Sequence, residues 1–187
     1  MDQQETLRAL VREATQDLRD TVKDIPQELF ERRPGPGLNP AGFIYFHVLR
    51  CWDLDVNVLC RGQDRNEDAW HRGGFSEALG YEPLGHGAGG SGIGFGYSDD
   101  EVDAAPMNHQ SLMRYHQILE DETYEYLDTV SADELNTERT NKNSRENPYR
   151  PERWLRHMIS HTNMHIGDVQ YVKGMLGMPD PTYPGSS

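Results

Sequence analysis

Four long segments of this chain repeat apolar residues at spacings of three and four, and this periodicity limits the possible folds more than any other feature. The first segment, residues 4–23, carries the repeat Leu7, Leu10, Val11, Ala14, Leu18 and Val22. Such spacing places apolar side chains along one stripe of an α-helix. Residues 40–59, 106–130 and 151–176 show the same pattern, and no segment alternates with period two for long. The sequence therefore predicts an all-α fold, a four-helix bundle.

The ends of two of these helices carry recognisable residues. Asn39 is the expected N-cap of the second helix, with Pro40 at its first helical position. Gly177 is the expected left-handed residue that ends the fourth helix. A further short turn is expected after Pro26.

Residues 61–105 lose the periodicity and include a glycine-rich run at 85–97. We therefore predict one domain, 1–187, in which residues 61–105 form a long loop inserted between the second and third helices and act as a flap or entrance. A phosphate cradle is disfavoured because no strand precedes the glycines and no Lys-Ser/Thr follows them. Four aromatic residues are expected to tie the loop to the bundle: Trp70, Phe75, Tyr81 and Phe95.

The charge balance of the 187 residues argues against some partners. The formal net charge is −13, whereas a surface that binds nucleic acid needs clustered Lys and Arg. No apolar run approaches the roughly 20 residues that cross a bilayer. The N-terminus lacks the pattern of a signal peptide, and two cysteines imply no disulfide scaffold. We expect a cytoplasmic protein with an acidic solvated surface and neither nucleic acid nor membrane as a partner.

Three histidines lie in the middle of predicted apolar stripes. His161 and His165 stand four residues apart on the fourth helix, so their imidazoles share one face. His47 lies near the centre of the stripe of the second helix. If these helices face each other, the three imidazoles can hold one divalent metal ion with a fourth position open. Zn²⁺, Ni²⁺, Fe²⁺ and Mn²⁺ all suit such ligands. The alternative is that each histidine is a core residue satisfied by a hydrogen bond.

Two familiar classes of metalloprotein do not fit. A zincin has a glutamate directly after the first histidine of the pair, where this chain has Thr162. A ferritin-like di-iron bundle uses Glu-x-x-His motifs, and no glutamate stands three residues before any histidine here. The predicted site is therefore mononuclear and rich in nitrogen ligands.

Several neighbours are candidates for supporting this metal site. Asp168 is expected on the side of His161, where it can accept an imidazole N–H, unless it is a surface acid. His157 falls at the edge of the stripe as a supporting or exposed residue. Cys51 can approach as a thiolate or be inert core filling, and His116 is a candidate fourth ligand. The remaining histidines have no patterned context: His71, His86 and His109.

The chain resembles the DinB/YfiT-like superfamily of four-helix-bundle metalloproteins. The resemblance rests on the helix start at 39–47, on the run His161-Thr-Asn-Met-His165-Ile-Gly-Asp168, and on the ending at 174–177. It implies that His47, His161 and His165 are the metal ligands, and that Asp168 takes a position at which relatives carry a longer Gln or Glu. It also implies Zn²⁺ or Ni²⁺ as the metal and, often, a homodimer.

The resemblance further implies a reaction class. Some members of the superfamily use the metal to activate a low-molecular-weight thiol, as in mycothiol-dependent maleylpyruvate isomerase and the bacillithiol transferases. The leading hypothesis is therefore a metal-dependent S-transferase or isomerase that acts on a small-molecule substrate with a thiol. A metal-dependent hydrolase and a non-catalytic metal-binding or sensor module remain as alternatives.

Overall fold

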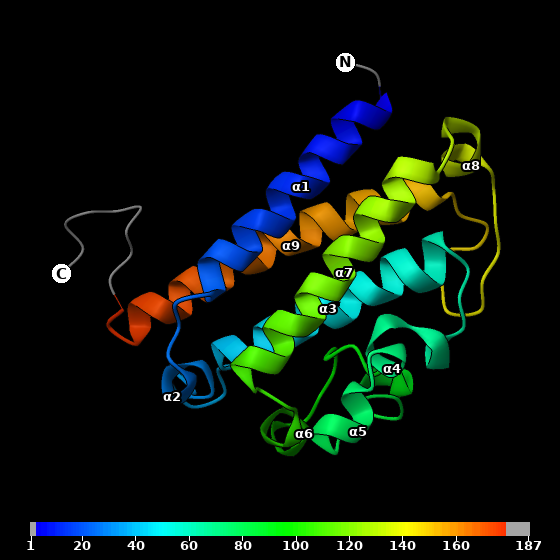
Figure 1. Ribbon diagram of the computed structural model, residues 1–187. Helices are drawn as coiled ribbons and strands as arrows, with labels where there is room; N and C mark the ends of the chain where they lie inside the picture. The colour runs from blue at the N-terminus through cyan, green and yellow to red at the C-terminus, as the bar shows by residue number, and fades with distance from the viewer. Residues whose placement is uncertain (1–2, 179–187) are drawn as a thin grey trace.

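Four long helices form the body of the protein, for which the computed structural model describes residues 3–178 (Figure 1). They are α1 (Gln3–Val22), α3 (Ala41–Asp53), α7 (His109–Thr129) and α9 (Pro151–Met175). α9 packs against α1 and α3, and α7 packs against the other sides of the same two helices. Residues 3–178 contain no strand, only one isolated bridge between Arg139 and Tyr149. The predicted all-α bundle is confirmed.

The second predicted helix changes its winding partway along. α3 continues without a break into the π-helical segment η1 (Leu54–Cys60), so the helical stretch reaches the predicted end. A π-turn is wider than an α-turn and frequently marks a functional site. Here it carries the buried Asp55, whose side chain reaches α9.

Two predicted helix starts are wrong. Asn39 does not cap α3; the cap position is Pro40, whose extended backbone precedes Ala41, and no side chain bonds to the first turn. α7 begins at His109, three residues after the predicted Pro106, because the side chain of Asn108 accepts a hydrogen bond from the amide of Ser111. Gly177 adopts the expected left-handed backbone, with φ of +72°.

The segment 61–105 is more ordered than its lack of periodicity suggested. It forms the short helices η2 (Arg65–Glu67), α4 (Ala69–Arg72), α5 (Phe75–Leu79), η3 (Ala88–Gly90) and α6 (Asp99–Ala104). Two further short helices lie in the other connections: α2 (Gln27–Phe30) between α1 and α3, and α8 (Ala132–Asn136) between α7 and α9. Trp70, Phe75 and Tyr81 are buried in the core, as predicted. The prediction for Phe95 is wrong, because its side chain is exposed.

A buried polar network fastens this insertion to the bundle. The guanidinium of Arg50 donates to Asp53 at 3.2 Å, to Asp68 at 2.9 Å and to the hydroxyl of Tyr115 at 3.0 Å. Its Nε also donates to the carbonyl of Gly92 at 3.2 Å. Arg50 is 1% exposed and the two aspartates are equally buried. One arginine of α3 therefore joins α4, α7 and the glycine-rich loop.

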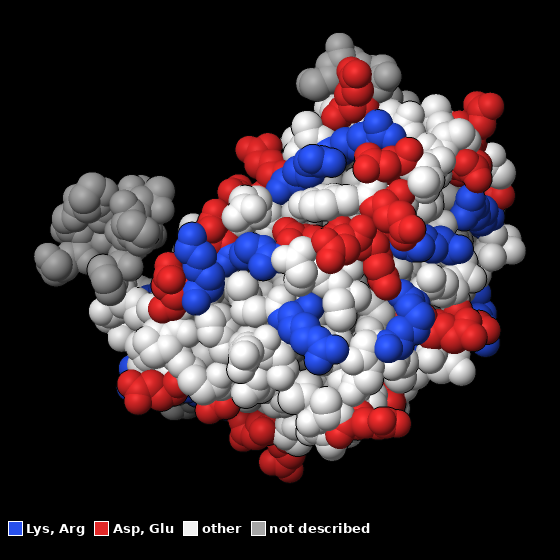
Figure 2. Space-filling view, viewed as in Figure 1, with Lys and Arg blue, Asp and Glu red and all other residues white. Residues whose placement is uncertain are grey.

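The charged side chains are distributed without a large basic patch on the face shown in Figure 2, where Lys and Arg lie among Asp and Glu. Within residues 3–178, no helix combines the length and apolar character that crossing a membrane requires.

Candidate metal centre

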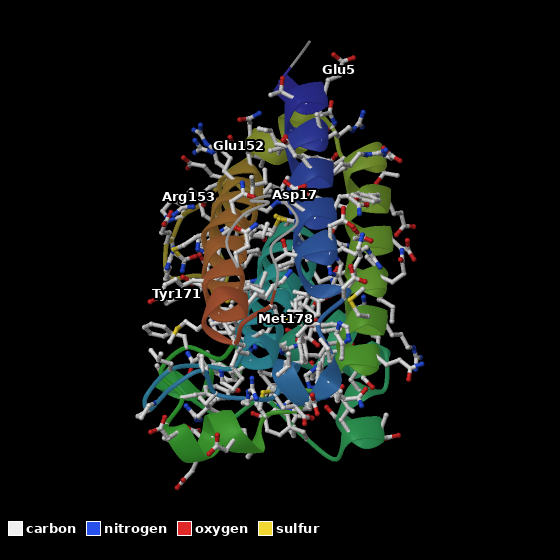
Figure 3. All side chains as sticks on the ribbon, turned by 90° about the vertical axis from the view of Figure 1, so that its left-hand side faces the viewer. Glu5, Asp17, Glu152, Arg153, Tyr171 and Met178 are labelled. Carbon is white, nitrogen blue, oxygen red and sulfur yellow. The ribbon has the colours of Figure 1, made fainter. Side chains whose placement is uncertain are left out.

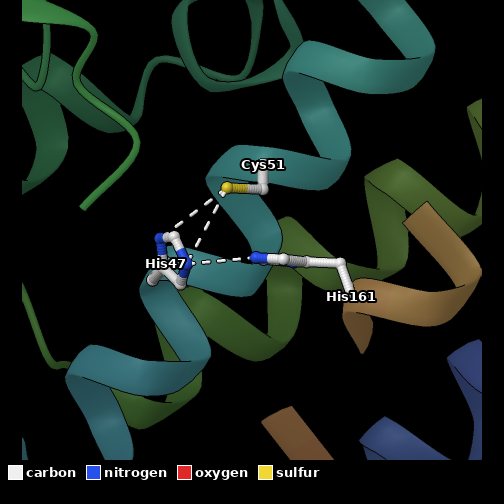
Figure 4. Close-up of side chains that lie close together, drawn as sticks. All are labelled: His47, Cys51 and His161. Atoms are coloured by element: carbon white, nitrogen blue, oxygen red, sulfur yellow. Dashed lines mark hydrogen bonds between the residues drawn. The ribbon is translucent and has the colours of Figure 1, made fainter. Parts of the chain in front are cut away.

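The three predicted histidines converge where α3 crosses α9. Nε2 of His161 lies 3.2 Å from Nε2 of His47 and 3.2 Å from Nε2 of His165 (Figure 4 shows His47 and His161). Nitrogen ligands that share one ion at about 2.1 Å stand roughly 3.0–3.5 Å apart, so these separations suit a common metal. The packing of α3 on α9 thus brings together residues 114 positions apart in the chain.

Hydrogen bonds on the opposite ring nitrogens orient two of these imidazoles. His47 donates from Nδ1 to the carbonyl of Ile93, in the glycine-rich loop. His165 donates from Nδ1 to the carboxylate of Asp168 at 2.8 Å. Each bond fixes the tautomer in which Nε2 carries the free lone pair, as metal ligation requires. Asp168 therefore contacts His165 rather than His161, on whose side the helical spacing had placed it.

The environment keeps two of the imidazoles neutral. Burial lowers the pKa of His47 to about 4, and burial together with the neighbouring His47 and His165 lowers the pKa of His161 to about 3. Only a neutral imidazole has a lone pair for a metal. The two rings are therefore in the ligating form throughout the neutral range.

Cys51 lies closer to the centre than its sequence context indicated. His47, Cys51 and His161 each offer a ligand atom within 4.8 Å of the others, and Cys51 Sγ lies 3.7 Å from Nδ1 and 4.0 Å from Nε2 of His47 (Figure 4). Burial raises the pKa of the Cys51 thiol. The thiol is consequently protonated at neutral pH unless a bound metal displaces the proton.

His157 supports the centre from one side. Its ring stacks on that of His161 with 5.3 Å between centroids, and its Nδ1 donates to Asp55 at 2.6 Å. Burial raises the pKa of Asp55. Asp55 was not among the predicted site residues, although it stands at i+4 from Cys51 and i+8 from His47 on one helical face. The π-helical winding of η1 was not foreseen.

The other histidines are engaged elsewhere. His116 is buried and shares a hydrogen bond of 2.6 Å with the hydroxyl of Tyr45, so it does not serve as a fourth ligand. His71 bonds to Asp68 and Glu82. His86 pairs with Glu101, and His109 packs on Phe30 with 4.7 Å between centroids.

Two cavities meet the centre from opposite ends. The first cavity, of about 430 Å³, is reached by His47 and His165, and the second, of about 380 Å³, by Cys51 and His157. Most other residues around the first cavity are apolar or aromatic: Leu38, Phe43, Ile44, Phe95, Tyr97, Val102, Tyr171, Val172 and Met175. Tyr171 extends from α9 away from the bundle and marks the outer rim of this cavity (Figure 3). Small molecules therefore have access to His47 and His165.

The close approach of Gly94 to His47 leads to a testable expectation. A Cβ on Gly94, whose φ is +84°, would lie 2.9 Å from Cβ and 3.0 Å from Nδ1 of His47. Gly94→Ala should displace His47 from the carbonyl of Ile93 and weaken metal binding by about 10–100-fold, the usual cost of losing an outer partner. Competition with a chromogenic chelator measures the affinity.

Gly80→Ala is the matched control for this change. Gly80 also has a positive φ, +63°, but an added Cβ meets nothing within 4 Å. It shares the backbone strain of Gly94→Ala without the clash. Equal metal affinities in the two variants would contradict the role given to the loop.

A second expectation concerns pH. The unfolded chain protonates its histidines near the ordinary pKa of 6.5, whereas native His47 and His161 do so only near 4 and 3. The stability that their neutral forms contribute is complete above pH 6.5 and is lost as the pH falls toward 4 and 3. Each imidazole adds a slope of up to about 1.4 kcal/mol per pH unit. Urea unfolding of the metal-free protein between pH 4.5 and 7 measures the free energy of unfolding. This free energy should vary less with pH in His161→Gln than in the unchanged protein, and identical slopes would contradict the lowered pKa of His161.

Comparisons with known proteins agree with this architecture. A family model described as the DinB superfamily matches residues 10–169. A solved structure described as a conserved protein from Enterococcus faecalis superimposes with a TM-score of 0.68 at 18% identity, covering 95% of this chain and 99% of the other. At that identity the likeness concerns the fold. No curated protein matches the chain by sequence.

Proposed function

Because the chain belongs to the DinB superfamily, we propose that it is a metal-dependent enzyme in which His47, His161 and His165 hold one divalent ion, zinc or nickel. The observation that carries this proposal is the convergence of three Nε2 atoms, with 3.2 Å from His161 to each of the other two. The first cavity gives access to His47 and His165, and the second lies beside them against Cys51 and His157.

The proposed reaction is transfer or isomerisation that uses a small thiol. A metal ion held by the three histidines would supply a lowered thiol pKa, so that a thiolate would be available as the nucleophile. The apolar first cavity suits an apolar acceptor molecule, held by residues such as Phe43 and Val172. We assign the uptake of the thiol proton to the imidazole of His157, which stacks on His161 and is oriented by Asp55. Water in place of the thiol would make the protein a hydrolase instead.

One observation favours a second candidate function. If Cys51 also ligates the ion, the site is closed by four protein ligands, as in structural or sensing sites. The distances of 3.7 and 4.0 Å from Cys51 Sγ to the ring nitrogens of His47 leave this within reach of a side-chain rotation. The protein would then be a non-catalytic metal-binding module.

Cobalt substitution separates these functions. We expect Co²⁺-loaded protein to show no sulfur-to-cobalt absorption near 300–350 nm until an external thiol such as 2-mercaptoethanol is added. The same response in Cys51→Ser would assign the band to the added thiol. A band already present without thiol, and absent from Cys51→Ser, would establish the closed site and overturn the enzymatic proposal.

A further inference from the structure

We propose that the second cavity is an anion subsite, in which Arg65, Lys142 and Arg145 bind the carboxylate or phosphate of a molecule whose other end reaches the metal centre. This inference rests on the proposed function, since the metal holds the reacting end of the ligand. It adds the chemical class of that ligand.

The charge of the cavity is opposite to that of the whole chain. The protein carries a formal net charge of −13, with 31 acidic and 18 basic residues. The second cavity nevertheless has three basic residues on its lining and a single carboxylate, that of Asp55. That carboxylate is already bonded to His157 at 2.6 Å. A small anion is therefore attracted to this cavity although the molecule as a whole repels it.

Among the residues that the structure describes, the three basic side chains lack acidic partners, unlike other basic residues nearby in the sequence. Arg150 and Arg153, nearby in the sequence, pair with Glu138 and Glu146. Arg145 and Arg153 both lie over the ring of Trp154, at 5.5 and 5.3 Å from its centroid, but only Arg153 also has an acidic partner. In the part of the chain that the structure describes, no carboxylate forms an ion pair with Arg65, Lys142 or Arg145. Their charges are thus available to a ligand.

Buried donors without partners around the cavity also indicate an anionic ligand. Nε of Arg65, Oγ of Ser91 and Nε1 of Trp154 are buried and have no hydrogen-bond partner within residues 3–178, and all three residues line the second cavity. Buried donors without partners are rare and each costs free energy. A carboxylate or phosphate offers only acceptor oxygens, so it would satisfy these donors as well as the charges once the side chains turn toward the cavity.

The cavity also lies beside the metal centre. Cys51 and His157 line it, and they contact His47 and His161 respectively. A ligand seated on the three cations would therefore extend past Cys51 and His157 toward the histidines. The expected ligand is a small thiol or substrate that has its anionic groups at the end remote from the reacting atom.

Paired thiols of matched length test this proposal on Co²⁺-loaded protein. The anionic probes are 3-mercaptopropionate and 6-mercaptohexanoate, and the neutral probes are 3-mercaptopropanol and 6-mercaptohexanol. The sulfur-to-cobalt absorption gives each Kd. We expect at least one anionic thiol to bind about tenfold more tightly than its neutral counterpart. Inorganic phosphate should compete with the anionic thiol and leave the neutral one unaffected if the subsite also accepts phosphate.

Charge-removing variants locate the effect. Arg145→Gln and Lys142→Gln, both at exposed positions, should abolish most of the preference for the anionic thiol without changing the Kd of the neutral one. Arg150→Gln removes the same charge from a residue paired with Glu138 and should keep the preference. Arg65→Gln should also reduce the preference for the anionic thiol. This change removes the hydrogen bond from Arg65 to the carbonyl of Ser91 as well as the charge.

The possible failures are distinguishable. If Co²⁺ binds and both kinds of thiol bind with equal affinity, the anion subsite is wrong while the metal centre stands. If neither thiol changes the spectrum of the cobalt protein, the result contradicts the proposed thiol-dependent function, and with it the thiol subsite that rests on that function. A preference that survives in both Arg145→Gln and Lys142→Gln would also overturn the subsite.

Discussion

Replacing His161 by alanine is expected to abolish stoichiometric binding of zinc or nickel. Nε2 of His161 is the atom that lies 3.2 Å from both of the other ring nitrogens, so its removal leaves His47 and His165 without a shared neighbour. Loss of a direct ligand should exceed the 10–100-fold weakening that follows loss of an outer partner. Metal content after dialysis against a weak chelator, measured by mass spectrometry, records the effect.

His86→Ala is the matched control for this experiment. It removes an imidazole that contacts the carboxylate of Glu101 and lies away from the converging nitrogens. It should retain a full equivalent of metal. An unchanged metal content in His161→Ala would contradict the assignment of the centre, whatever its catalytic function.

Replacing Arg50 by methionine is expected to lower the free energy of unfolding by about 3–5 kcal/mol, because it leaves buried aspartates without their counter-charge. Asp53 and Asp68 are 0% and 1% exposed and both lie within 3.2 Å of the guanidinium. Methionine fills much of the same space, so the loss reports mainly the uncompensated charges. Urea unfolding of the metal-free proteins at pH 7 measures the change.

Arg156→Met provides the comparison on another helix. Arg156 pairs with Glu152 at 2.8 Å, but its side chain is 62% exposed, and such surface pairs contribute about 0–1 kcal/mol. If Arg50→Met cost no more than Arg156→Met, the network would not be the element that holds the insertion on the bundle.

The Arg50 network also connects stability to the metal centre. The Nε of Arg50 holds the carbonyl of Gly92, and Ile93, the next residue, accepts the hydrogen bond from His47. Arg50 and the proposed metal ligand His47 lie one turn apart on α3, and both therefore hold adjacent residues of the glycine-rich loop. A bound metal should in turn stabilise this part of the insertion, since it binds only the native arrangement.

The sequence alone determined the bundle and the helices that carry the histidines. Periodicity is a local property: side chains three and four residues apart share a helix face wherever that helix packs. This is why the stripes of α1, α3, α7 and α9, and the positions of His47, His161 and His165 on them, were predictable. The resemblance to the DinB superfamily rested on the same segments and is confirmed.

Only the tertiary structure decided what surrounds those histidines. The bond from His47 to Ile93 spans 46 residues and that from His157 to Asp55 spans 102, and neither has a local pattern. The insertion folds on buried charges and short turns, which leave no periodic signal in the sequence. The same holds for the cationic cavity, since Arg65 and Arg145 share its lining only because the chain folds back on α3. Contacts between distant residues depend on how helices pack, and a sequence pattern records only the faces that are available for packing.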